Sequence, residues 1–141
     1  MITDINIDMI IEKNKNMKIL EKNGKIKLVY LHKIIKKTVQ RKNKAGTINT
    51  FYSAYLPAEI VDYFNVKENT IFFYSKDDEV RITTNRPTVE HQEIKVQSSN
   101  QFSIPKSYLK PEEFEMVKLV LDFGRVDDYK SGLGVLIIEL I

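Results

Sequence analysis

The sequence predicts a mostly β protein with a minority of short helices, and three observations indicate that class. Apolar and polar residues alternate through most of the chain, which is the period of strands. An Asn-Gly pair at 23–24 separates two such runs, and prolines at 57 and 105 each follow a strand-like run directly. With 141 residues, 43% hydrophobic and 29% charged, the chain has the composition of one folded domain or two very small ones.

Composition also excludes several classes of protein. Zero Cys excludes disulfides, iron–sulfur clusters and thiolate zinc sites. The apolar runs are too short to span a bilayer, and the first residues lack signal-peptide order, so we expect a cytoplasmic protein without membrane contact. His32 and His91 lack partners at metal spacing, and no phosphate-cradling Gly loop or nucleophile motif is present. We therefore expect no enzyme activity, no catalytic residues, no metal and no cofactor.

Positive charge is concentrated in the first half of the chain. From Lys13 to Lys44 there are 12 Lys or Arg residues and one acid, Glu21, which gives +11 over 32 residues. Residues 71–141 instead carry 9 basic and 12 acidic residues, so Lys-rich composition alone does not explain the block. A block of this kind repels itself unless an anion lies against it, and nucleic acid is the usual partner.

The N-terminal third contains one strong hairpin signal. Residues 1–16 alternate weakly and fit either a strand or a short helix, which we leave open. The runs 17–21 and 26–31 flank Asn23-Gly24, a pair that accepts positive φ at both central turn positions, so a β-hairpin is predicted. Two further strand-like runs follow, at 34–42 with its basic residues and at 48–56.

The segment after residue 56 predicts a strand end, a short helix and a hairpin. Pro57 suits the first helical position, Glu59 follows in the first turn, and Asn65 is a residue that can end a helix in the left-handed conformation. Strands are then predicted at 71–75 and 80–84, joined by a turn at 76–78.

The same order recurs 48 residues later, from Pro57 to Pro105. A strand at 101–104 runs into Pro105 and a short helical turn, and strands at 116–123 and 135–141 follow as partners. This recurrence predicts an internal duplication. We divide the chain into a basic N-terminal extension with a probable hairpin (1–32), a first repeat (33–87) and a second repeat (88–141).

Both repeats resemble the AbrB/MazE-type swapped-hairpin family of bacterial DNA-binding proteins. In the first repeat the resemblance lies in Leu56-Pro57-Ala58-Glu59-Ile60-Val61, in 65–69, and in the hairpin through Asp77-Asp78-Glu79-Val80. In the second it lies in 96–105, with its Ile104-Pro105 step. The resemblance implies a small closed β-barrel of interleaved hairpins, which a chain with two copies completes alone as a monomeric pseudo-dimer or together with a second chain as a homodimer.

The sequence also departs from this family. Gly46 lies eleven residues before Pro57, farther than the family pattern places it; Asn69 replaces the second turn Gly, and Asn100 stands where Gly is usual. Tandem copies are also found in the MraZ group, but its Asp-x-x-x-Arg signature is missing at both Pro steps, so we do not assign the chain to that group.

In the family, basic side chains from the strand and loop before the Pro step contact DNA. The resemblance therefore assigns DNA contact to basic residues of the first copy and mainly neutral hydrogen-bonding residues of the second. The set is Lys33, Lys36, Lys37, Arg41, Lys42 and Lys44, followed by Lys95, Gln97, Asn100 and Gln101. The acidic groups at 77–79 and 127–128 fit turns. Clustered aromatics at 51–55 and 72–74 are expected in the core.

These observations favour a non-enzymatic regulator that binds double-stranded DNA, such as a repressor or antitoxin. The alternative is a protein-binding module from a phage or plasmid, such as an inhibitor of a host nuclease or an anti-CRISPR-like protein, whose partner is a protein. Abundant Lys, Ile and Asn indicates an AT-rich genome, which suits either function.

Overall fold

The computed structural model describes residues 17–40, 46, 48–64, 66, 69–129 and 134–141. The hypotheses on residues 1–16, on Asn65 as helix end, and on Arg41, Lys42 and Lys44 as DNA contacts fall outside these residues. Ten strands and two short helical segments make up the described part of the chain, so the mostly β class is confirmed.

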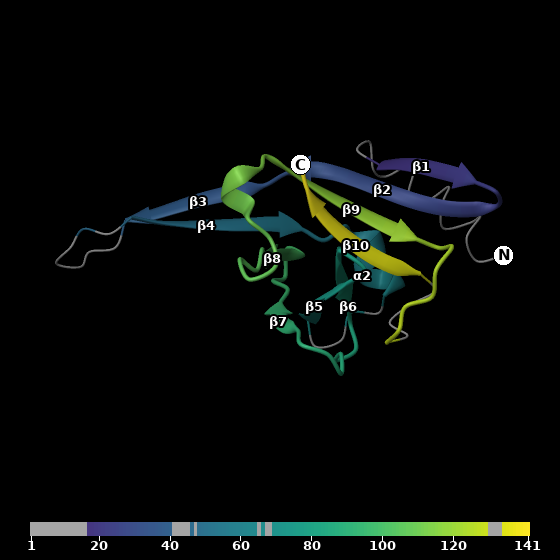
Figure 1. The fold of residues 1–141 in the computed structure, drawn as a ribbon. Coiled ribbons are helices and arrows are strands. Elements are labelled where there is room, and N and C mark those ends of the chain that lie inside the picture. The colour runs from purple at the N-terminus through teal and green to yellow at the C-terminus, as the bar shows by residue number, and fades with distance from the viewer. Residues whose placement is uncertain (1–16, 41–45, 47, 65, 67–68, 130–133) are drawn as a thin grey trace.

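Seven strands form one antiparallel sheet in the order β1-β2-β9-β10-β6-β5-β7 (Figure 1). Reading outward from the central β10–β6 pair, β9 and then β2 lie on one side, and β5 and then β7 on the other. The strands are β1 (Met17–Lys22), β2 (Lys25–Lys33), β5 (Thr70–Lys76), β6 (Glu79–Thr83), β7 (Gln92–Lys95), β9 (Met116–Asp122) and β10 (Val135–Leu140).

A second antiparallel sheet has three strands in the order β3-β4-β8, with β3 (Ile35–Gln40), β4 (Ile48–Tyr55) and β8 (Gln101–Ser103). The chain passes from β2 into β3 at Ile34, whose backbone N–H bonds to the carbonyl of Glu115 instead of a partner in either sheet. The β3–β4 hairpin projects well beyond the body of the molecule (Figure 1). We call this hairpin, from the described strands β3 and β4, the arm.

Each Pro step is followed by a tight helical turn. After Pro57 the chain forms α2 (Ala58–Tyr63), which buries Ile60 against the sheet and confirms the predicted helix. After Pro105 it forms only a single turn closed by the Leu109 N–H on the Pro105 carbonyl, followed by the 3-10 segment η2 (Pro111–Glu113). The second helix is short because Pro111 has no backbone donor and keeps the preceding residue, Lys110, out of the helical conformation.

The core lies between α2, the inner face of the large sheet and the base of the small sheet. It is built from β-branched, aliphatic and aromatic side chains, the types that pack well on a pleated surface. Its most deeply buried members come from both sheets and include Leu28, Tyr30, Ala54, Ile71, Phe73, Phe102, Leu119 and Leu121. Residues 28 and 30 of β2 thus belong to the same core as the strands of both repeats.

The predicted turns are confirmed at two hairpins. Asn23 and Gly24 have φ of 55° and 77°, so both occupy the left-handed region that the β1–β2 turn requires. Asp77 and Asp78, at φ of 53° and 61°, form the β5–β6 turn in the same way. Asp tolerates this region because its short polar side chain can bond to the nearby backbone.

No closed barrel is found among the described residues, whose strands form two antiparallel sheets. The large sheet ends at β1 and β7 and the small one at β3 and β8, and an isolated bridge between Val96 and Phe102 joins the two sheets next to β7. At Ile34 the chain leaves β2 of the large sheet and enters β3 of the arm. The arm strands pair with each other and, through β4, with β8.

Candidate nucleic-acid interface

The outer face of the small sheet brings together residues from both sequence repeats. Residues directly opposite in an antiparallel pair point to the same face, so Lys37 shares a face with its partner Phe51. Alternation along β4 places Ser53 and Tyr55 on that face too. Across the next pair, Ser103 and Gln101 of β8 join them, and Gln101 Nε2 donates to Ser53 Oγ at 2.6 Å.

The inner face of the arm carries a second group of cations. Lys36 lies opposite Tyr52 on this face, and Lys106 Nζ stands 5.5 Å from the centroid of the Tyr52 ring. Farther along the same face Ala54 and Phe102 enter the core. Lys36 and Lys37 are therefore neighbours in sequence that point to opposite faces, and the arm is basic on both. Sequence reasoning missed Lys106, although its place directly after Ile104-Pro105 was a signal.

The polar loop of the second repeat is a tight turn against the end of β4. The Asn100 N–H bonds to the Gln97 carbonyl at 2.8 Å, and Asn100 has φ of 64°. This left-handed conformation explains why a residue that can replace Gly stands here. The Asn100 carbonyl accepts the Leu56 N–H at 2.8 Å, which fixes the turn beside the first Pro step. Gln97 is exposed on this turn.

Two of the predicted contact residues lie outside the strands of the small sheet. Lys95 is at the end of β7, and its Nζ donates to Thr70 Oγ1 at 2.8 Å. The next residue, Val96, forms a bridge with Phe102 of β8, so Lys95 lies beside the small sheet. Lys33 is exposed at the end of β2, opposite Met116, where the chain turns toward the arm.

The described members of the predicted set therefore occupy four places. Lys36 and Lys37 belong to the arm, Gln97, Asn100 and Gln101 to the turn and β8, Lys33 to the end of β2, and Lys95 to the end of β7.

The basic block of the sequence is split by the fold. Lys18, Lys22, Lys25 and Lys27 belong to the β1–β2 hairpin, whose turn lies at the opposite end of the molecule from the arm (Figure 1). No acid occurs between Glu21 and Glu59 in the sequence. Within the described residues, no ion pair joins Lys36 or Lys37 to an acid. The arm thus retains its positive charge for an external partner.

The prediction that both aromatic clusters lie in the core is confirmed for residues 72–74 and wrong for part of the cluster at 51–55. Phe72, Phe73 and Tyr74 are buried in β5. Phe51 and Tyr55, however, are 49% and 46% exposed. They alternate with residues that face the body, and the arm extends past the core, so nothing in the described chain covers them. The outer face therefore combines a cation with two exposed rings.

A cluster of charges at the β5–β6 turn has internal partners instead. The buried guanidinium of Arg81 bonds to Glu79 at 3.0 Å and approaches Asp77 at 3.4 Å, and Arg125 bonds to Glu79 and to Asp122, each at 3.0 Å. Asp127 is more than a turn residue, since it is buried and accepts hydrogen bonds from Thr83 and Tyr74. Burial and this carboxylate raise the pKa of Tyr74 to about 12.

Because of this cluster, the stability of the folded protein depends on pH in the acid range. Partial burial works to raise the pKa of Glu79, but hydrogen bonds from Arg125 and Arg81 outweigh it and hold that pKa below its ordinary value of 4.5. Because the pKa of Glu79 is lower in the folded state than in the unfolded state, the stabilisation is complete above pH 4.5 and is lost as pH falls through the folded-state pKa.

We expect the urea midpoint to fall more steeply below pH 4.5 in the native protein than in Glu79→Gln. Equal pH profiles would contradict the prediction.

No protein-family model, curated protein or solved structure matches this chain. No helix among the described residues is long and apolar enough to cross a membrane. In the same part of the chain, no three acidic or His side chains converge to hold a metal ion. Function must therefore be inferred from the arm and its surroundings.

Proposed function

We propose that this protein is a non-enzymatic regulator that binds double-stranded DNA through the arm and the adjoining turn at 97–100. The observation that carries the proposal is that Lys37 from the first repeat and Gln101 from the second lie on the same face of one sheet. Lysines free of acidic partners neutralise phosphates, and amide side chains hydrogen-bond to base edges. Both kinds of group are presented by the small sheet.

The shape of the arm supports this function. The major groove of B-DNA is about 12 Å wide and admits a two-stranded β-ribbon. The arm is such a ribbon, it projects from the body, and its outer face carries Lys37 and Ser53, next to Gln101 and Ser103 of β8 on the same face of the small sheet. Lys36 and Lys106 on the other face have long side chains that can reach flanking phosphates.

The pairing of strands supports an internal duplication of the swapped-hairpin kind. Ala54 and Phe102 lie three residues before Pro57 and Pro105 respectively, and they face each other in the β4–β8 pair. The second strands of the two hairpins, β6 and β10, also pair with each other. The strand ahead of each copy pairs with the hairpin of the other copy, β2 with β9 and β7 with β5. This is the exchange expected of two interleaved repeats related by a two-fold axis.

The proposal is tested by the salt dependence of duplex binding. If the arm neutralises on the order of five phosphates, the logarithm of the association constant should fall by about 4 to 5 per tenfold rise in salt. Fluorescence anisotropy of a labelled duplex, titrated with protein at several salt concentrations, measures this slope. A flat salt response, or no binding at low salt, would exclude DNA as the partner.

The duplication is tested by isolating the first repeat. Residues 33–87 retain β4, β5 and β6 but lose the partners β8, β7 and β10. Unpaired edges and a half-exposed core favour self-association, so this fragment should aggregate or dimerise, whereas residues 17–141 should fold. Light scattering and urea unfolding of both fragments measure the outcome. A monomeric 33–87 that unfolds cooperatively would show that the repeats are independent.

A further inference from the structure

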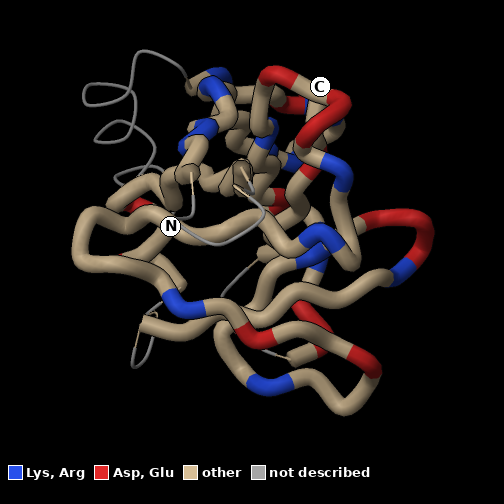
Figure 2. Tube along the Cα trace, turned by 90° about the vertical axis from the view of Figure 1, so that its left-hand side faces the viewer, with Lys and Arg blue, Asp and Glu red and all other residues tan. Residues whose placement is uncertain are grey.

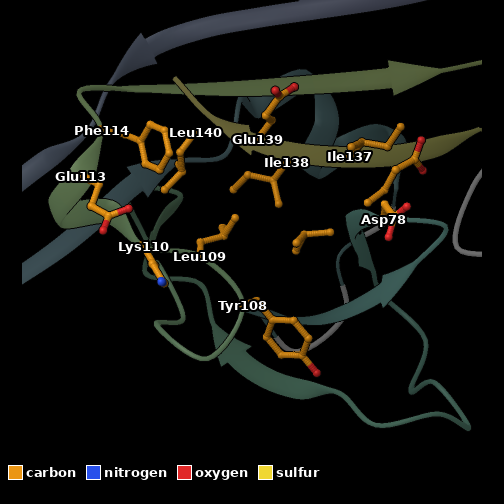
Figure 3. Close-up of a pocket in the computed structure, with 12 residues that line it drawn as sticks. Asp78, Tyr108, Leu109, Lys110, Glu113, Phe114, Ile137, Ile138, Glu139 and Leu140 are labelled. Atoms are coloured by element: carbon orange, nitrogen blue, oxygen red, sulfur yellow. The ribbon is translucent and has the colours of Figure 1, made fainter.

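A groove of about 680 Å³ lies between the central strands β6 and β10 of the large sheet and the segment that follows the second Pro step (Figure 3). Ile138 and Leu140 of β10 form one wall, and Leu109 and Phe114 of the connecting segment face them. Phe114 is 36% exposed, so part of this apolar lining is open to solvent. The groove has the size of a recognition site, and no described segment fills it.

The charge of the groove is predominantly acidic. Its lining includes four acids and a single cation, Lys110. Glu79 and Glu139 have partners within the chain, in Arg81 and Arg125 and in Lys118 respectively. Asp78 and Glu113 form no ion pair among the described residues and stand at opposite ends of the groove (Figure 3).

Further acids lie beside the groove. Glu112 adjoins Glu113 in η2, and Glu115 bonds through its backbone to Ile141. Figure 2 shows acidic stretches on this side, close to the C-terminus. An apolar floor between negative ends fits an extended segment in which large apolar side chains are flanked by cations.

The arm of this same chain has that chemistry. On its outer face Lys37 is flanked by Phe51 and by Val39, which is 37% exposed. Ile48, near the tip, is 62% exposed. Ile48 lies on the opposite face of the arm from Phe51 and Val39, so both faces expose apolar side chains. Phosphate contacts use the lysines but leave these apolar side chains uncovered, and exposed apolar surface beside a cation suits a protein contact.

We propose that the groove is the docking site for the arm of a second copy of this protein, so that two chains exchange arms in a closed dimer. In a two-fold pair each arm enters the other's groove, so the contact is made twice. Each contact then needs to supply only half of the roughly 1,200–2,000 Å² that a stable interface buries. The N-terminal segment 1–12 is a poorer occupant, because it has three acids and no Lys or Arg.

The decisive experiment uses two full-length variants with complementary charge changes. Lys37→Glu gives the arm a negative charge at residue 37. Asp78→Asn with Glu113→Lys removes two negative charges from the groove and adds a positive one. Asn is chosen at 78 because that position has φ of 61°, which Asn tolerates. Each variant alone places like charges together, so its dimer should weaken by about tenfold or more. Mixed in equal amounts, they should form a heterodimer in which both contacts are attractive.

Sedimentation velocity on nuclease-treated protein, over about 1 to 100 µM, measures association without DNA. The controls are Lys18→Glu on β1 and Asp62→Lys on α2, which change charge in the same directions at exposed positions outside both surfaces and should leave the dimer intact. Phe51→Ala removes apolar contact without changing charge and should also weaken the native dimer. Thermal unfolding of every variant checks that it is folded.

Three results would overturn the proposal. The first is a native protein that stays monomeric at every concentration. The second is a dimer that survives both charge reversals, or variants that fail to pair with each other. The third is a dimer that is lost on removing residues 1–16 but kept in the groove variant, which would assign the dimer contact to that segment and not to the groove. Lys37 serves both proposed surfaces, so arm docking and DNA binding compete for the arm. The sedimentation experiment contains no DNA, so failure of the dimer leaves the proposed DNA binding standing.

Discussion

Replacing Lys36 and Lys37 together by Glu should lower affinity for duplex DNA by about 100-fold at moderate salt, because two phosphate contacts become two repulsions. Both side chains are exposed, on opposite faces of the arm, and neither has an acidic partner among the described residues. The slope of log affinity against log salt should also become shallower by about 2, one for each lysine lost. Anisotropy titrations of the same duplex with native and variant protein measure both quantities.

The matched control is Lys18→Glu with Lys22→Glu. It makes the same change of charge on β1, at the end of the molecule opposite the arm, where both lysines are also exposed. This variant should keep most of the affinity. Exposed charge substitutions rarely change stability by more than about 0.5 kcal/mol, so both proteins should unfold at nearly the native urea midpoint. Equal losses of affinity in the two variants would indicate attraction by net charge and remove the arm from the proposal.

Truncating Phe102 to Ala should destabilise the protein by about 3 to 5 kcal/mol. Its side chain is 1% exposed, packs 5.8 Å from the Phe73 ring centroid and stands opposite Ala54 in the β4–β8 pair. The substitution opens a cavity where the two sheets meet, and the small residue opposite cannot fill it. Such a loss is a large part of the 5 to 15 kcal/mol that typically holds a domain folded. Urea unfolding followed by far-UV circular dichroism measures it.

Phe51→Ala is the control for this prediction, since it makes the same truncation on the neighbouring strand. Phe51 is 49% exposed on the arm, so its removal opens no cavity and should cost less than about 1 kcal/mol. A similar loss in both variants would mean that the arm contributes to the core as much as the strand base does, contrary to the packing described here.

The sequence predicted the elements well because their signals are local. Asn23-Gly24 and 77–78 specify turns by the φ values they accept, and Pro57 specifies the start of α2. Alternation identified the strands that flank them. The recurrence from Pro57 to Pro105 correctly located β8, β9 and β10, but it did not foresee the 3-10 segment, because the effect of Pro111 depends on where the preceding turn closes.

The candidate site was predicted only in part. The basic residues of the arm were identified from the charge pattern, but a sequence does not show where each side chain points in the fold. The structure places the described lysines of the Lys13–Lys44 block on two hairpins, β1–β2 and the arm, and puts Lys95 on β7 and not on the arm. It also exposes Phe51 and Tyr55, which hydrophobicity alone had assigned to the core. Lys106 lies beside the arm because its Nζ packs over the ring of Tyr52 in β4.

The sequence by itself determined the mostly β class, the turns, the Pro-initiated helix and the excess of positive charge around the arm, since each depends on residues close together in the chain. Only the tertiary structure decided which strands pair, that they form two sheets, and that Lys37 and Gln101 share a face. The physical reason is that register and burial are set by contacts between segments far apart in sequence. A shift of one residue in the β4–β8 register would turn every side chain of one strand to the other face.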